Sequence, residues 1–155
     1  MKIAKMIALF LCLILLLGMM TACQKKMPLT AAGFTEIMEN AGLEVRDDSD
    51  AIDEDSLPTA VMYAAGKDYL IEYYAFADSQ TAQRCFDSNQ KDFDEENPRK
   101  TMTVQITSGR YDYYAFTASD QFYVLTRIEN TMVGCITDAQ YKQAVLEHIE
   151  ALGYK

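Results

Sequence analysis

The residue types that most often carry catalysis or hold metals are sparse in this chain. His148 is the only histidine among 155 residues. A hydrolase of the triad type needs a histidine beside a serine or cysteine, with a carboxylate that orients the ring. A metal site needs several ligands at a set spacing, such as CxxC or HExxH. Because neither pattern occurs, we expect His148 to be a structural residue and the chain to have no metal, no cofactor and no enzyme activity.

Acidic residues are dense at one place, where six of them occupy the nine positions from Asp47 to Asp55. Calcium binds carboxylate oxygens that alternate along a loop, and such a loop usually turns at a glycine. This stretch contains no glycine, and like charges at this density repel one another. We therefore interpret it as a solvated loop and expect no calcium site. Because the whole chain has 23 acidic residues, any single pair of carboxylates is uninformative.

Two of the four cysteines, Cys85 and Cys135, could form a disulfide outside the cytoplasm. The bond would close a loop of about fifty residues and would stabilise the fold by roughly 4 kcal/mol on the chain-entropy account. Each cysteine also falls on an apolar face, where a free thiol packs as a small hydrophobic group. The spacing alone does not choose between these alternatives.

Tyrosines offer a better lead to binding than the titratable residues do. A tyrosine is apolar in its ring and polar at its tip, so an open sheet face bearing tyrosines can stack on sugars or receive a peptide. Solvent-facing tyrosines are also common on sheets for their strand propensity alone. Six tyrosines fall in predicted strands and make up the candidate binding face: Tyr73, Tyr74, Tyr111, Tyr113, Tyr114 and Tyr123.

The N-terminal segment has the pattern of a secretion signal. Lys2 and Lys5 precede an uncharged run from Met6 to Met20 that is rich in Leu, Ile and Met. A run of about fifteen residues fits a signal peptide and is short for a membrane-spanning helix. The run ends in Met20-Thr21-Ala22-Cys23, in which a bulky apolar residue and two small residues stand before a cysteine.

These four residues resemble the lipobox of bacterial lipoproteins. The resemblance covers residues 1–23 only. It implies that the signal is removed after Ala22, and that Cys23 receives a thioether-linked diacylglyceryl group and becomes the mature N-terminus. Two acyl chains anchor a protein stably where one does not. The resemblance to the lipobox therefore also implies a lipid-anchored protein on the extracytoplasmic face of the cell membrane. The expected organisation is a signal peptide over 1–22, a lipidated tether over 23–29 and one domain over 30–155.

The mature chain would be acidic and of single-domain size. Loss of residues 1–22 leaves 133 residues, in which 23 acidic residues face 12 basic ones, for a net charge of −11. A chain of this length can bury a core without disulfides or metals. Its charge excludes nucleic acid as a partner in the absence of cations.

The mature sequence predicts three helices that alternate with strands. Thr30, Asp78 or Ser79, and Thr137 or Asp138 are the expected helix caps. Gly42, Asn97-Pro98 and Gly153 are the expected helix ends. Hairpin strands are expected over 60–65 and 69–76. Four further strands from Thr101 to Ile136 have connections so short that they predict an antiparallel meander.

This element order predicts an α+β fold. We expect a two-layer sandwich with a largely antiparallel sheet of about five to seven strands, three helices on one face and the other face open to water. The expected function is a membrane-anchored binding module for an envelope component or a protein. An accessory subunit that docks on a membrane complex is the alternative, and a small envelope hydrolase is a weaker one. The expected partners are the membrane, through the lipid, and a protein or an envelope polymer.

Overall fold

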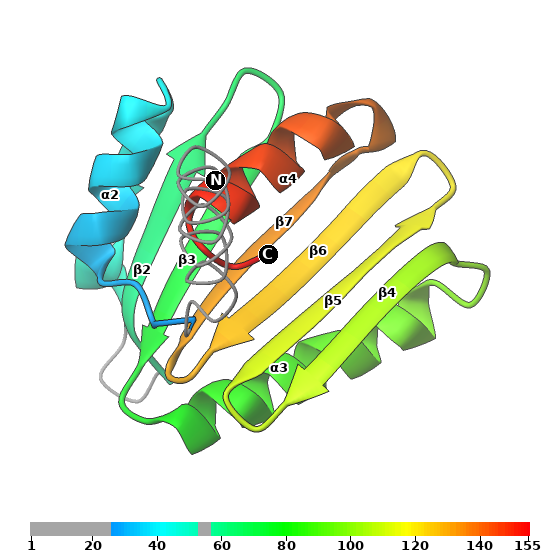
Figure 1. The fold of residues 1–155 in the computed structure, drawn as a ribbon, viewed down its shortest axis with the longest axis horizontal. Coiled ribbons are helices and arrows are strands. Elements are labelled where there is room, and N and C mark those ends of the chain that lie inside the picture. Colours follow the sequence, from blue (N-terminus) through cyan, green and yellow to red (C-terminus); the bar gives the residue numbers. More distant parts are fainter. Residues whose placement is uncertain (1–25, 53–56) are drawn as a thin grey trace, which may run out of the picture.

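A computed structural model describes residues 26–52 and 57–155, and within these ranges the chain forms seven strands and three α-helices. Figure 1 shows one curved sheet with helices on both of its faces. The elements in chain order are α2 (Ala31–Asn40), β1 (Glu44–Asp47), β2 (Pro58–Ala65), β3 (Leu70–Phe76), α3 (Ser79–Glu96), β4 (Thr101–Ser108), β5 (Tyr111–Ala118), β6 (Gln121–Ile128), β7 (Thr131–Asp138) and α4 (Lys142–Ala151). The predicted α+β class is confirmed.

The sheet consists of two meanders that meet at its centre. Its strand order is β1-β2-β3-β7-β6-β5-β4, and every neighbouring pair is antiparallel. Two-residue turns join the last four strands, as their short spacing predicts. The junction of β3 with β7 pairs segments about sixty residues apart in sequence, such as Glu72 with Gly134. Strands β1 and β4 are the two edges of the sheet.

Helix boundaries follow local capping chemistry. The Thr30 hydroxyl accepts a hydrogen bond from the Gly33 amide, and the Asp78 carboxylate accepts one from the Thr81 amide at 2.7 Å. At the end of α2, Gly42 adopts a φ of 83° and the Leu43 amide donates to the Met38 carbonyl. This left-handed closure favours glycine. Helix α4 starts one short 3-10 turn later than expected, at Lys142.

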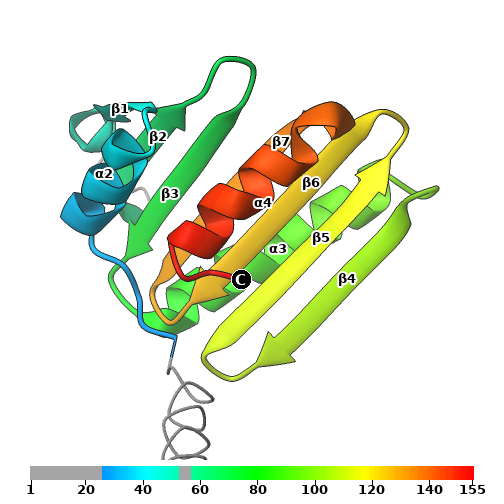
Figure 2. The same ribbon diagram turned by 45° about the horizontal axis from the view of Figure 1, so that its top comes forward.

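The helices are not all on one face, contrary to the expectation from the sequence. Helices α2 and α4 lie in front of the sheet in Figure 1, and α3 crosses behind it (Figures 1 and 2). Residues alternate between the two faces along each strand, and two separate cores result. The first core gathers around Phe34, Tyr73 and Ile149 beneath α2 and α4. The second gathers around Phe86, Phe116 and Leu125 beneath α3.

Coverage by the helices is uneven on both faces. On the front face, α2 and α4 lie over one half of the sheet and the centre, whereas β5 and β4 have no helix in front of them (Figure 2). On the back face, α3 contacts β3, β7 and β6. One of the two grooves described below lies in the uncovered area of the front face, and the other lies beside α3 on the back face.

Candidate functional site

A groove of about 720 Å³ lies on the back face, between α3 and strands β3 and β7. We call it the α3 groove. Small-molecule sites in proteins typically have roughly 300–1,000 Å³ and are lined mainly by apolar side chains. The lining here is mostly apolar as well and includes Leu70, Tyr74, Phe76, Cys85, Phe93, Leu125, Met132 and Ile136. The size and the lining are those of a binding site.

A glycine in the middle of a strand forms the floor of the α3 groove. Gly134 is paired with Glu72 of β3 on one side and with Leu125 of β6 on the other. A Cβ at Gly134 would lie 3.3 Å from Leu125 Cδ1, which is a tight contact. The missing side chain therefore lets Leu125 lie close to the backbone of β7 at the floor of the groove. A glycine inside a strand pattern is a signal for such a feature.

Helix α3 supplies one wall of the groove. Cys85, Asn89 and Phe93 follow one another at intervals of four residues and so share a helix face. The Phe93 ring meets Tyr123 edge-on, with ring centroids 5.5 Å apart, and this contact fixes one end of the wall. The Asn89 side-chain amide donates to the Cys85 carbonyl at 2.8 Å. At the outer end, the exposed side chains of Leu70 and Ile136 form an apolar mouth.

Glu72 is the one acidic residue among the described residues that line the α3 groove. The Tyr74 hydroxyl donates to Glu72 Oε2 at 2.8 Å. Burial, reinforced by this carboxylate, raises the pKa of Tyr74, so its hydroxyl stays protonated and keeps donating. No described residue donates a hydrogen bond to Glu72 Oε1. The site thus combines apolar walls with one carboxylate oxygen that can accept a hydrogen bond from a ligand.

The six candidate tyrosines do not form one open face, so this prediction is corrected. Tyr73, Tyr113 and Tyr114 are buried, and the other three are half-buried. Tyr73, Tyr111 and Tyr113 pack in or against the front core, whereas Tyr74, Tyr114 and Tyr123 pack in or against the back core. The physical reason is that helices cover both faces, so strand alternation sends tyrosines into two cores. Only Tyr74 lines the α3 groove, and Tyr111 and Tyr113 line a second groove on the front face.

Cys85 and Cys135 are free thiols, so the alternative of a disulfide is not realised. Cys85 packs against the back core from α3, and Cys135 belongs to the front core. The sheet therefore separates the two sulfur atoms. Burial, with Glu72 as a smaller cause, raises the pKa of the Cys135 thiol to about 12. Cys135 is therefore a buried free thiol that packs as a small hydrophobic group, which was the alternative to a disulfide.

His148 lies on α4 and contacts the ring of Tyr69. Its Nε2 is 2.8 Å from the Tyr69 hydroxyl, and the two ring centroids are 5.8 Å apart. Burial lowers the pKa of His148, which favours the neutral imidazole. Within residues 26–52 and 57–155, no serine or cysteine side chain is hydrogen-bonded to His148, and no group of three metal-ligating side chains is assembled.

The proposed lipidation residue Cys23 lies outside the described residues, as do the signal segment and the acidic residues Asp53 to Asp55. Among the helices that the structure describes, none combines the length and the apolar character needed to span a bilayer. Residues 26–29 of the proposed tether are described, and Leu29 packs against the front core, whereas Met27 is exposed.

Comparison with known proteins gives little guidance. No protein-family model matches the chain, and no curated protein matches it in sequence. The crystal structure of a GTP binding regulator from Thermotoga maritima is similar with a TM-score of 0.49 and 9% sequence identity, over 79% of this chain and 84% of that one. A likeness at this level identifies neither a family nor a ligand for this protein.

Proposed function

We propose that this protein is a lipid-anchored binding module on the extracytoplasmic face of the cell membrane. We further propose that its α3 groove binds a small amphiphile with a cationic or hydrogen-bond-donating head group. The lipobox-like residues before Cys23 support the anchor. The proposed class of ligand rests on the position of Glu72. This residue lies among apolar residues in the α3 groove, and one of its carboxylate oxygens is available to accept a hydrogen bond.

The two parts of such a ligand have separate partners in the α3 groove. An alkyl chain would lie against Leu125, Met132 and Ile136, where each buried methylene contributes roughly 0.8 kcal/mol. An ammonium group at the head of the chain would donate to Glu72. A carboxylate head would instead be repelled by Glu72 in a site of reduced dielectric. The α3 groove should therefore discriminate between amphiphiles by the sign of the charge on their head groups.

A matched pair of ligands tests this selection. Dodecylamine and dodecanoate have the same chain length and opposite charge. Each would displace N-phenyl-1-naphthylamine, a fluorescent apolar dye, from the full-length protein at concentrations below micelle formation. We expect dodecylamine to bind about tenfold more tightly than dodecanoate, which corresponds to about 1.4 kcal/mol. Glu72→Gln should abolish this preference while dye binding persists.

Two further variants locate the binding within the protein. Gly134→Val adds a side chain to the floor of the α3 groove, at a strand position where valine is favoured, and should weaken dye binding. Lys67→Gln changes an exposed residue of the turn between β2 and β3, outside both grooves, and should leave dye binding unchanged. Equal affinity for the two amphiphiles, or dye binding insensitive to Gly134→Val, would refute the assignment of the α3 groove.

A further inference from the structure

The N-terminal segment leaves the domain at a fixed position on the front face. The Tyr73 hydroxyl donates to the Leu29 carbonyl at 2.7 Å, and the Leu29 amide donates to the Tyr154 hydroxyl at 3.4 Å. Three residues earlier, the Lys26 ammonium lies 4.4 Å from the centroid of the Tyr111 ring and donates to the Gly153 carbonyl. Residues 26–29 are therefore held against the domain, and the site of exit is next to Tyr111.

The distance from this exit to Cys23 is short. Three residues of extended chain span at most about 10 Å. If Cys23 carries acyl chains, as the proposed function holds, the surface around Tyr111 lies within about that distance of the lipid headgroups. The lipid anchor would then place the front face of the domain, around Tyr111, toward the bilayer.

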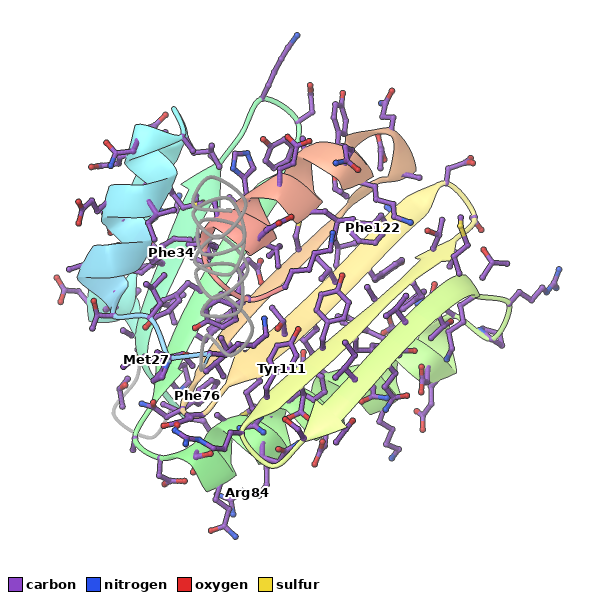
Figure 3. All side chains as sticks on the ribbon, viewed as in Figure 1. Met27, Phe34, Phe76, Arg84, Tyr111 and Phe122 are labelled. Carbon is purple, nitrogen blue, oxygen red and sulfur yellow. The ribbon has the colours of Figure 1, made fainter. Side chains whose placement is uncertain are left out.

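An apolar groove lies at this surface. It has a volume of about 270 Å³ and is bordered by β4, β5 and the side of α4. We call it the β4 groove. Three apolar side chains of the edge strand are largely exposed in it: Met102 at 67%, Val104 at 50% and Ile106 at 47%. Strand β4 carries no charged residue. Figure 3 shows Tyr111 and Phe122, which also line this groove, on the same front face as Met27.

The rim of the β4 groove is basic, although the protein as a whole is acidic. Lys142 and Lys155 line it, and Lys26 lies over the Tyr111 ring beside it. The Lys142 ammonium is 5.2 Å from the centroid of the Phe122 ring at the groove floor. Among the described residues that line the groove, none is acidic. An apolar floor with a lysine rim suits a lipid whose head group is an anion.

We propose that the β4 groove is the membrane-facing surface of this protein and that it binds an anionic phospholipid beside the anchor. The acyl and glycerol portion lies against Met102, Val104 and Ile106. The phosphate is paired with Lys142 and Lys26. The location of the contact in the cell rests on the proposed lipid anchor, whereas the affinity of the groove for anionic lipid is a property of the domain.

A single introduced tryptophan can report this contact, because the chain contains none. Val104→Trp places the reporter in the β4 groove. Ile136→Trp, at the mouth of the α3 groove on the opposite face, is the matched control. The full-length lipidated protein would be reconstituted in vesicles of phosphatidylcholine and phosphatidylglycerol whose acyl chains are brominated. We expect at least about twofold stronger quenching for V104W than for I136W, because bromine quenches at contact distance within the bilayer.

The charge of the rim is tested with the same reporter. The mature sequence from residue 23 with Cys23→Ser has neither the acyl chains nor the apolar run from Met6 to Met20, and it should still associate with vesicles that contain phosphatidylglycerol. Lys142→Gln should lower this association about fivefold, because each lysine near an anionic surface contributes on the order of 1 kcal/mol. Vesicles of phosphatidylcholine alone should not be bound measurably, and the difference should shrink in high salt.

The possible results separate this inference from the proposed function. Failure of the proposed anchor would show as an unmodified Cys23 by mass spectrometry, while lipid-dependent quenching of V104W would persist in the free protein. Equal quenching of V104W and I136W would overturn the inference. So would a blue shift of V104W emission that rises with protein concentration in the absence of lipid, because that result would assign the β4 groove to contact between two copies of the chain.

Discussion

The guanidinium of Arg127 on β6 and the carboxylate of Asp112 on β5 form an ion pair that is sealed from solvent. Arg127 Nη2 lies 2.6 Å from Asp112 Oδ2, and the two side chains are 0% and 1% exposed. Arg127 Nε donates to the same oxygen at 2.7 Å, and Nη1 donates to the Glu129 carbonyl at 2.8 Å. A buried charge that loses its partner is strongly destabilising.

The first prediction concerns this pair. Asp112→Asn or Arg127→Met should lower the free energy of unfolding by about 3–5 kcal/mol, because each leaves one charged or polar group buried without its partner. The double variant Asp112→Leu with Arg127→Met should recover much of that loss. Urea denaturation monitored by circular dichroism measures the free energy of unfolding of the two single variants and the double variant. A single-variant loss below about 1 kcal/mol would show that the pair is not sealed in solution.

The second prediction is a dependence of stability on pH through His148. Burial lowers its pKa in the folded protein. The unfolded chain therefore binds a proton more readily than the folded protein, and stability from this residue is present above the unfolded pKa and is lost as the pH falls below it. We expect the wild type to lose more free energy of unfolding between pH 7.5 and 5.5 than His148→Asn does. Parallel losses in the two proteins would contradict this.

The third prediction concerns the thiols of Cys85 and Cys135, tested on the full-length protein in which Cys12 and Cys23 are both replaced by serine. Cys85 is half-buried at the wall of the α3 groove, and burial raises its pKa, so maleimide should modify it slowly at pH 7 and faster at pH 8.5. Cys135 is buried and should react only after unfolding. Dodecylamine in the α3 groove should slow the labelling of Cys85. Peptide mass mapping with Cys85→Ser as the control identifies the site, and undiminished labelling with bound amphiphile would argue against the α3 groove as the site.

The fourth prediction tests the anchor. The mature wild-type protein should begin at a diacylglyceryl-modified Cys23 and should partition into detergent during phase separation with Triton X-114. Cys23→Ser should incorporate no labelled fatty acid and should keep residues 1–22, because removal of the signal depends on the lipobox cysteine. Equal labelling of the two proteins would remove the basis for the lipid anchor.

The fifth prediction concerns the attachment of residues 26–29 to the domain. The Tyr154 hydroxyl is hydrogen-bonded to the Leu29 amide and to the Thr131 hydroxyl in the front core. Tyr154→Phe should lower the free energy of unfolding by about 1–3 kcal/mol, because the buried Thr131 hydroxyl and the part-buried Leu29 amide each lose a hydrogen bond. Tyr123→Phe is the matched control, since its hydroxyl donates to Gln121 at an exposed position and should change stability by less. Equal effects of the two substitutions would show that residue 29 is not held in this way.

Local sequence determined the secondary structure closely. The caps at Thr30 and Asp78, the glycine end at Gly42 and the period-two strands from Thr101 onward all lie where residue chemistry indicates. Capping and alternation involve residues within a few positions of one another, so they can be read without knowledge of the tertiary fold. The proposed signal and its cysteine are likewise contiguous in sequence, and they remain predictions.

Tertiary structure alone decided which face each helix covers, and the candidate sites depend on that choice. The pairing of β3 with β7 brings Glu72 beside Gly134 across about sixty residues, and no local pattern indicates it. Once α3 crosses behind the sheet with Cys85, strand alternation buries Tyr114 under this helix and turns Cys135 of β7 toward the opposite face. The amphipathic pattern of a helix states only that one of its faces is buried. The packing partner is set by long-range contacts, and for this reason the α3 groove and the β4 groove could not be read from the sequence.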